Sequence, residues 1–124
     1  MPTAEDRDRR AADLRERAAL VRREGWEPYE NVWSSGEVAG VRAVLSEPDA
    51  LDAACPTWAP TLWGIAAAEA DARTGYRSTR RWFAAIAGIS ALDVVHDAAE
   101  KVRVRSAFHS LDEVRSRYSG EDQS

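Results

Sequence analysis

The sequence predicts a small all-α protein, a compact bundle of about five to seven short helices. Its length of 124 residues favours one domain, and its 44% hydrophobic and 31% charged residues favour a folded one. Within residues 1–118, Ser or Thr is followed three residues later by an acidic residue at five places, namely Thr3 and Asp6, Ser34 and Glu37, Ser46 and Asp49, Ser90 and Asp93, and Ser110 and Glu113. This spacing is typical of helix starts, because each side chain hydrogen-bonds a backbone N–H of the other residue. Apolar residues then recur at helical spacing.

The first helix is predicted over Ala4 to Glu24. Thr3 and Asp6 form the start signal, and Gly25 is a stop signal because glycine adopts the left-handed conformation that closes helices. The inward stripe is expected to comprise Ala11, Leu14, Ala18 and Val21. Because this stripe is narrow and rich in Ala, we expect the helix to pack closely on a neighbour.

A loop bounded by Pro and Gly follows, and it carries Trp26, Tyr29 and Trp33. A short strand over Tyr29 to Trp33 is an alternative for this segment. It would pair with Val102 to Phe108, where apolar and basic residues alternate as in a strand. The bundle would then contain one minor two-stranded element.

Three helices are expected in the middle of the chain. The first spans Gly36 to Leu45, and the second spans Glu47 to Ala54 with Pro48 in its first turn. A turn over residues 55–60 contains two prolines and leads into the third helix, which ends near Arg73. This third helix is expected to bury Leu62, Ile65, Ala66 and Ala72.

The last third of the chain is predicted to hold three more helices. One begins at Ser78 and ends before Gly88, with Trp82, Phe83 and Ile86 facing inward. The next begins after Ser90 and continues to about Ala107, and the last spans Leu111 to Tyr118. The expected domain therefore covers residues 1–118, and residues 119–124 form a disordered acidic tail.

No strong catalytic motif occurs in the chain, so an enzyme is the less favoured function class. The single cysteine, Cys55, precedes a proline in an apolar turn and is expected to act as a small hydrophobic residue. A third functional hypothesis is a small metal-dependent enzyme at His96, whose helical neighbours are Asp93, Asp97 and Glu100. This pattern supplies too few ligands for a complete site, so we expect no metal and no cofactor.

Charge is distributed unevenly along the chain. Residues 24 to 72 hold nine acidic residues against Arg42 alone, whereas residues 73 to 118 hold nine basic and five acidic residues. The basic half suggests an alternative function, a DNA-binding transcriptional regulator or antitoxin-like protein that uses the region from Arg73 to Trp82. Its candidate nucleic-acid contacts are Arg73, Arg77, Arg80 and Arg81. The turn in this region is expected to be longer than a helix-turn-helix motif requires.

The favoured function is a small non-catalytic protein-binding or regulatory module. Trp26, Tyr29 and Trp33 are its candidate contact residues, because Trp and Tyr are enriched at interface hot spots. The expected partner is another protein, with self-association as an alternative and DNA as a less favoured ligand. The 16 Arg against one Lys suggest a bacterial or phage source. We expect a cytoplasmic location and no membrane span, because no apolar run reaches the required length.

Overall fold

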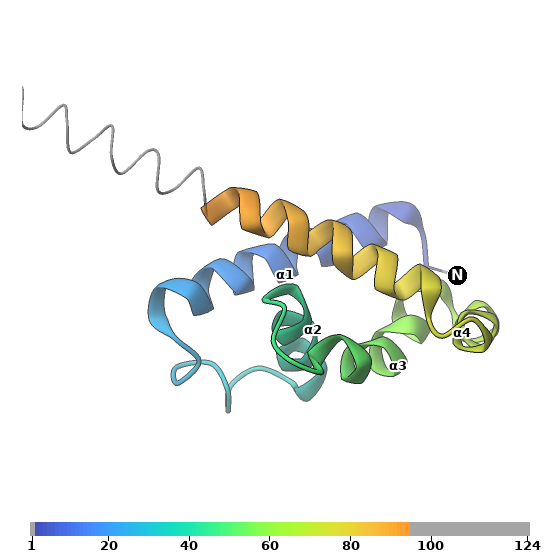
Figure 1. The fold of residues 1–124 in the computed structure, drawn as a ribbon, viewed down its shortest axis with the longest axis horizontal. Helices are drawn as coiled ribbons and strands as arrows, with labels where there is room; N and C mark the ends of the chain where they lie inside the picture. Colours follow the sequence, from blue (N-terminus) through green and yellow to red (C-terminus); the bar gives the residue numbers. More distant parts are fainter. Residues whose placement is uncertain (1, 95–124) are drawn as a thin grey trace, which may run out of the picture. The chain divides into compact units, whose positions relative to one another are not determined.

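The computed structural model describes residues 2–94, and every regular element in this part of the chain is a helix. The elements are α1 (Ala4–Glu24), α2 (Ser35–Val44), α3 (Ala50–Trp63), α4 (Ile65–Arg73) and a further helix over residues 77–94 (Figure 1). By its contacts the chain divides into a unit over Met1–Ala91 and a second over Leu92–Ser124. The first unit is an all-α bundle, which confirms the predicted fold class.

Several predictions fall outside the described residues. They are the helices expected after residue 94, the strand candidate Val102 to Phe108, the domain end at residue 118 and the tail over residues 119–124. Each of these stays a prediction.

The helix α1 has the predicted bounds and both predicted end signals. The Thr3 hydroxyl accepts a hydrogen bond from the backbone N–H of Asp6, and the Asp6 carboxylate accepts one from the backbone N–H of Thr3, both at 3.1 Å. Gly25 adopts φ +79° and donates its N–H to the carbonyl of Val21. Local hydrogen bonding therefore determines both ends of this helix.

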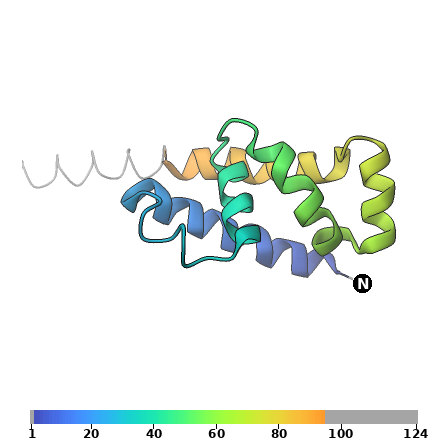
Figure 2. The same cartoon turned by 90° about the horizontal axis from the view of Figure 1, so that it is seen from below.

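Within the first unit, residues 77–91 of the later helix lie alongside α1 and run in the same direction (Figures 1 and 2). Near the end of the later helix, Ser90 accepts hydrogen bonds from the Arg22 guanidinium of α1, at its carbonyl (3.0 Å) and at its hydroxyl. Leu14 from α1 and Phe83 from the later helix are buried in the same core cluster. The later helix is thus held to α1 by apolar packing and by a hydrogen-bonded side chain.

This later helix continues through Gly88, so the predicted break between two helices is wrong. Gly88 does not adopt a positive φ, and it is exposed. The inward face instead steps through Phe83, Ile86 and Ser90 at spacings of three and four residues, all of them buried. Burial of this continuous face outweighs the weak helix propensity of a single glycine.

A single helix, α3, replaces the predicted helix over Glu47 to Ala54 and the turn over residues 55–60. Pro56 and Pro60 lie inside α3 and are exposed. The carbonyls that lose their partners therefore lie toward water, which can hydrogen-bond them. The opposite face is buried and comprises Ala54, Cys55, Trp58, Ala59 and Leu62. Burial of this face outweighs two missing backbone hydrogen bonds.

The start of α3 also differs from the prediction. Ser46 and Asp49 do not form a capping box but adopt left-handed backbone conformations, with φ +59° and +61°. Two left-handed residues close together turn the chain between α2 and α3. Pro48 consequently lies in the connection and not in the first turn of a helix.

The predicted helix that ends at Arg73 is divided at Gly64, which adopts φ +88°. Because this residue redirects the chain, the apolar stripe of α3 does not continue into α4. Ile65 is therefore 75% exposed, and Ala66 and Ala72 are exposed as well, although we predicted all three to be buried. The buried residues of α4 are Ala68 and Asp71.

Candidate functional site

The segment over residues 26–33 is a series of turns, so the loop prediction is confirmed and the alternative of a strand over Tyr29 to Trp33 is wrong. The N–H groups of Tyr29 and Glu30 donate to the carbonyl of Trp26 at 2.9 Å, and those of Val32 and Trp33 donate to the carbonyl of Tyr29 at 3.0 Å. These local hydrogen bonds use the backbone groups that a strand ladder would need.

The three aromatic rings that we predicted as contact residues form one cluster. The rings of Tyr29 and Trp33 stack with centroids 4.5 Å apart, and the Trp26 ring meets Trp33 edge-on at 6.2 Å. All three residues are half-buried and pack against the core. Each ring therefore contributes both to the fold and to the surface, and the contact role stays a prediction.

The Trp26 ring is fixed by Arg42 and Glu47, which sequence reasoning did not identify as site residues. The Arg42 guanidinium lies 4.3 Å from the ring centroid and pairs with Glu47 at 2.8 Å, while Glu47 also accepts the indole N–H of Trp26 at 2.8 Å. Arg42 makes a longer pair with Glu30 at 3.4 Å. Arg42 is the only basic residue between residues 24 and 72. This single cation among nine acidic residues is the sequence feature that could have identified it as a site residue.

The Trp33 ring is fixed in a similar way from α1. The Arg17 guanidinium lies 4.8 Å from the ring centroid and pairs with Asp13 and Glu37, each at 2.8 Å. The backbone N–H of Ser34 is the main cause that lowers the pKa of Glu37, so this carboxyl is charged near neutral pH. Cation–π contact and ion pairing together hold Trp33 in one orientation.

A pocket of about 510 Å³ adjoins the aromatic cluster. It lies between the loop, α2 and α3 and is lined by Glu30, Asn31, Trp33, Ser35, Val38, Ala39, Arg42, Ala50 and Ala53. Val32, which lies between the lining residues Asn31 and Trp33 in the chain, is 76% exposed. Rigid rings, an exposed aliphatic side chain and an adjoining pocket are the features of a surface that binds a protruding side chain.

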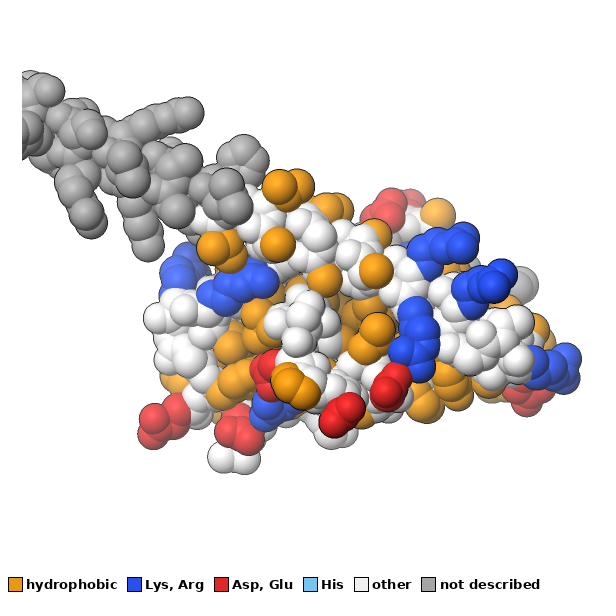
Figure 3. Space-filling view, viewed as in Figure 1, with side chains coloured by type: hydrophobic (Ala, Val, Ile, Leu, Met, Phe, Trp, Pro, Cys, Tyr) orange, Lys and Arg blue, Asp and Glu red, His pale blue; other side chains and the backbone are white. Residues whose placement is uncertain are grey.

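Acidic side chains lie on this surface and on the adjoining parts of the chain. Glu27, Glu30 and Asp49 are exposed, and within residues 2–94 neither Glu27 nor Asp49 has an ion-pair partner. Figure 3 shows acidic side chains along the edge formed by the loop and the α2–α3 connection, and basic ones toward the start of the helix over residues 77–94. Only the part of the predicted basic region before residue 95 lies within the described residues, and there Arg80 pairs with Asp52 of the acidic region at 2.7 Å.

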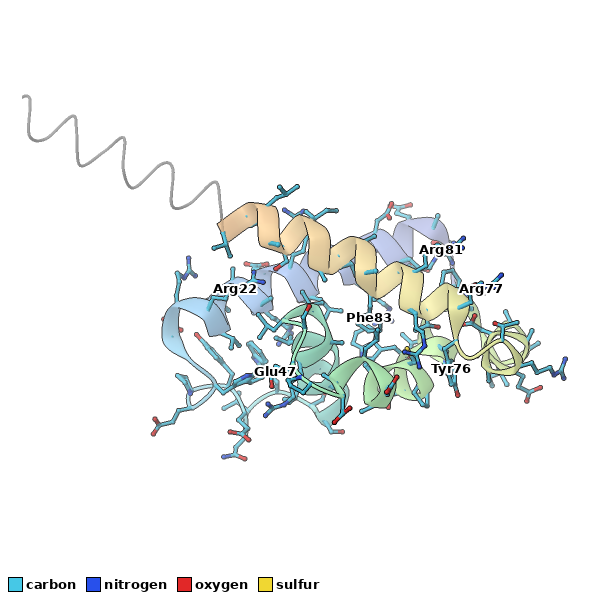
Figure 4. The ribbon with its side chains drawn as sticks, in the orientation of Figure 1. Arg22, Glu47, Tyr76, Arg77, Arg81 and Phe83 are labelled. Carbon is cyan, nitrogen blue, oxygen red and sulfur yellow. The ribbon has the colours of Figure 1, made fainter. Side chains whose placement is uncertain are left out.

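The four predicted nucleic-acid contacts do not have equivalent environments. Arg80 pairs with Asp52 at 2.7 Å and donates a hydrogen bond to the carbonyl of Gly75 at 2.8 Å. Its guanidinium group is therefore engaged within the fold. Arg73, Arg77 and Arg81 are exposed. Arg77 and Arg81 project outward from the first two turns of their helix (Figure 4). Only these three guanidinium groups remain as candidate phosphate contacts.

The connection between α4 and the following helix comprises residues 74–76, so the expectation of a turn too long for a helix-turn-helix motif is wrong. However, Asp71 already occupies the start of the second helix, where it accepts the backbone N–H groups of Ser78 and Thr79. Burial alone would raise the pKa of Asp71, but these hydrogen bonds and the one from the Thr79 hydroxyl lower it. A phosphate cannot use the same N–H groups while this carboxylate holds them.

The described residues contain no group of three or more metal-ligating side chains. His96, the centre of the metal hypothesis, lies outside residues 2–94. Cys55 is fully buried, and burial raises the pKa of its thiol, which makes it a packing residue as predicted. No helix in this part of the chain has the length and apolar character to cross a membrane.

Comparison with protein-family models, with curated protein sequences and with solved structures finds no match to this chain.

Proposed function

We propose that the protein is a non-catalytic protein-binding module that holds its partner on the loop over residues 26–33 and in the adjoining pocket. One observation carries the proposal: the loop that exposes Val32 to 76% also supplies the adjacent residue Trp33, whose ring contacts Arg17, to the wall of a pocket. Trp, Tyr and Arg are the residue types that dominate interface hot spots.

The fixed geometry of the loop supports this function. Arg17 and Arg42 hold two of the rings in the free protein, so a partner would meet side chains that have already lost most of their rotamer freedom. Binding to such a surface costs less conformational entropy than binding to a loose one. The pocket volume of about 510 Å³ also lies within the range of natural binding pockets, roughly 300–1,000 Å³.

The test compares captured partners between two matched variants. Val32 and Ile65 are both aliphatic and are 76% and 75% exposed, on the loop and on α4 respectively. Immobilised protein carrying Val32→Asp should lose a specific partner from a bacterial lysate, whereas protein carrying Ile65→Asp should retain it. Retention of every partner by Val32→Asp would contradict the proposal.

DNA binding is a second candidate function, favoured by the three-residue turn before Arg77 and by the outward direction of Arg77 and Arg81. Arg77→Ala combined with Arg81→Ala should then abolish retention on duplex DNA at low salt. Arg10→Ala combined with Arg23→Ala removes two exposed guanidinium groups of α1 and serves as the control. Equal retention by both double variants would remove this candidate.

A further inference from the structure

We infer that the partner presents a basic segment with a bulky apolar side chain, which enters the pocket beside Trp33 while its cations lie against Glu27, Glu30 and Asp49. This inference deepens the proposed function and rests on it. A ligand would have to match two properties of this surface, and these properties indicate the chemistry of the ligand.

The first property is the apolar wall of the pocket. Trp33, Val38, Ala39, Ala50 and Ala53 supply a ring, an aliphatic side chain and three methyl groups. Because three of these side chains are Ala, the space next to them is left for a ligand. A Leu, Met or Phe side chain would bury apolar area against this wall, and removal of that area from water favours binding.

The second property is the charge around the pocket. Glu30 lines it, and Glu27 and Asp49 are exposed on the adjoining loop and at the start of α3. Arg42 is the only cation in the lining, and it already contacts Glu47, Glu30 and the Trp26 ring. An acidic ligand would have to compete for this guanidinium, whereas a basic ligand meets the exposed carboxylates of Glu27 and Asp49, which have no ion-pair partner within residues 2–94. Complementary charge of this kind selects the partner and speeds association.

The same charge argues against a nucleic acid at this site, because its phosphates would face the acidic residues around the pocket. A membrane surface is disfavoured for the same reason, since cytoplasmic leaflets are anionic. A basic peptide segment is therefore the occupant that satisfies both the apolar wall and the acidic surroundings.

The test uses three fluorescein-labelled peptides and the full chain. The basic probe has a central Leu pair flanked by Lys, the acidic probe has Glu in place of Lys, and the anchorless probe keeps Lys but has Ser in place of Leu. Fluorescence anisotropy should show binding of the basic probe, about tenfold weaker binding of the anchorless probe, and no binding of the acidic probe. Affinity for the basic probe should fall as salt is raised.

Two protein variants test the two properties separately. Ala53→Trp fills the pocket from an exposed position, and Ala67→Trp makes the same change at an exposed position of α4 that does not line it. Glu27→Gln, Glu30→Gln and Asp49→Asn together remove three charges, and Asn keeps the left-handed conformation of residue 49 accessible. The matched control neutralises Asp8, Glu16 and Glu69, which are exposed elsewhere.

We expect Ala53→Trp to abolish binding of the basic probe and Ala67→Trp to leave it unchanged. The three neutralised charges should weaken binding by about tenfold, with little effect from the control set. Circular dichroism checks that each variant is folded. If Ala53→Trp does not fold, the neutralised variant still decides the sign of the ligand charge.

The outcomes separate this inference from the proposed function. If Val32→Asp loses a partner from lysate but the acidic probe binds as well as the basic one, the protein-binding function stands and the basic ligand is wrong. If Val32→Asp retains every partner, the function itself fails. Self-association that rises with concentration and is abolished by Ala53→Trp would assign the pocket to a second copy of the chain and overturn the inference.

Discussion

The carboxylate of Asp71 in α4 holds Thr79 at the start of the following helix. Its Oδ2 accepts the Thr79 hydroxyl at 2.6 Å and the Thr79 backbone N–H at 3.1 Å, and its Oδ1 accepts the N–H of Ser78 at 2.8 Å. The Thr79 hydroxyl in turn accepts the indole N–H of Trp63 at 3.1 Å. This chain of hydrogen bonds joins α3, α4 and the helix over residues 77–94.

Replacement of Asp71 should therefore destabilise the fold strongly. Asp71 and Thr79 are both buried, so Asp71→Ala leaves three donors without an acceptor. We expect a loss of about 2–3 kcal/mol in the free energy of unfolding. Urea denaturation measures this loss, with Glu69→Ala as the control for an exposed carboxylate of the same helix. Equal midpoints for the two variants would contradict this role of Asp71.

Stability should fall in acid. The pKa values of Asp71 and Glu37 are lowered in the folded state, and that of Asp6 is lowered to about 2, chiefly by the backbone N–H of Thr3. Carboxyls in the unfolded state have pKa values of about 4. Between about pH 4 and about pH 2, the unfolded state therefore binds more protons than the folded state does. The stabilisation is present above about pH 4 and is lost as pH falls toward about 2.

Thermal unfolding measured between neutral pH and about pH 2 checks this dependence, and Asp71→Asn should flatten part of it because Asn does not titrate in this range. A melting temperature of the wild-type protein that is independent of pH over this interval would contradict the prediction.

Replacement of two glycines by Ala should change the free energy of unfolding in opposite directions. A Cβ at Gly40 would lie 2.9 Å from Cζ2 of the Trp58 ring, which is buried and donates its indole N–H to the carbonyl of Gly36. Gly40→Ala should therefore cost about 1–3 kcal/mol by displacing this ring. Gly88 is helical and exposed, with no atom within 4 Å of its Cβ position. Gly88→Ala should stabilise by about 0.5–1 kcal/mol. Parallel denaturant titrations would show shifts of opposite sign.

Removal of the Arg42 guanidinium should loosen the aromatic loop without unfolding the bundle. Arg42→Ala loses the contact with Trp26 and the pair with Glu47, which we expect to cost about 1 kcal/mol. Hydrogen exchange of the backbone amides of residues 29–33 should accelerate, while exchange in the middle of α1 should not. Arg73→Ala, at an exposed position, is the control. Unchanged exchange in the loop would show that the aromatic rings keep their positions without Arg42, and it would contradict this prediction.

The sequence predicted the elements whose ends depend on local interactions. The capping boxes at Thr3 and Ser34 start α1 and α2 as expected, and Gly25 and Gly75 follow helix ends. Both members of each capping pair lie within one helical turn, so no distant residue is needed to form them. The bounds of α1 therefore agree with the prediction, and those of α2 differ from it by one residue at each end.

Predictions failed where a distant contact decides the local conformation. Pro56 and Gly88 are helix breakers by propensity, yet both lie within helices because the opposite faces are buried against other elements. Ile65 was expected to be buried because it fits the stripe that begins at Leu62, and Gly64 ends that stripe by redirecting the chain. Propensity is a weak guide when packing contributes more free energy.

The sequence by itself determined that the protein is helical and that Trp26, Tyr29 and Trp33 share one loop, because these properties depend on residue type and short spacing. Only the tertiary structure decided what the loop can do. Arg17 reaches Trp33 from α1, Arg42 reaches Trp26 from α2, and α3 supplies Ala50 and Ala53 to the pocket. Contacts between residues so far apart in the chain form only when the helices pack, because no local pattern encodes which faces meet.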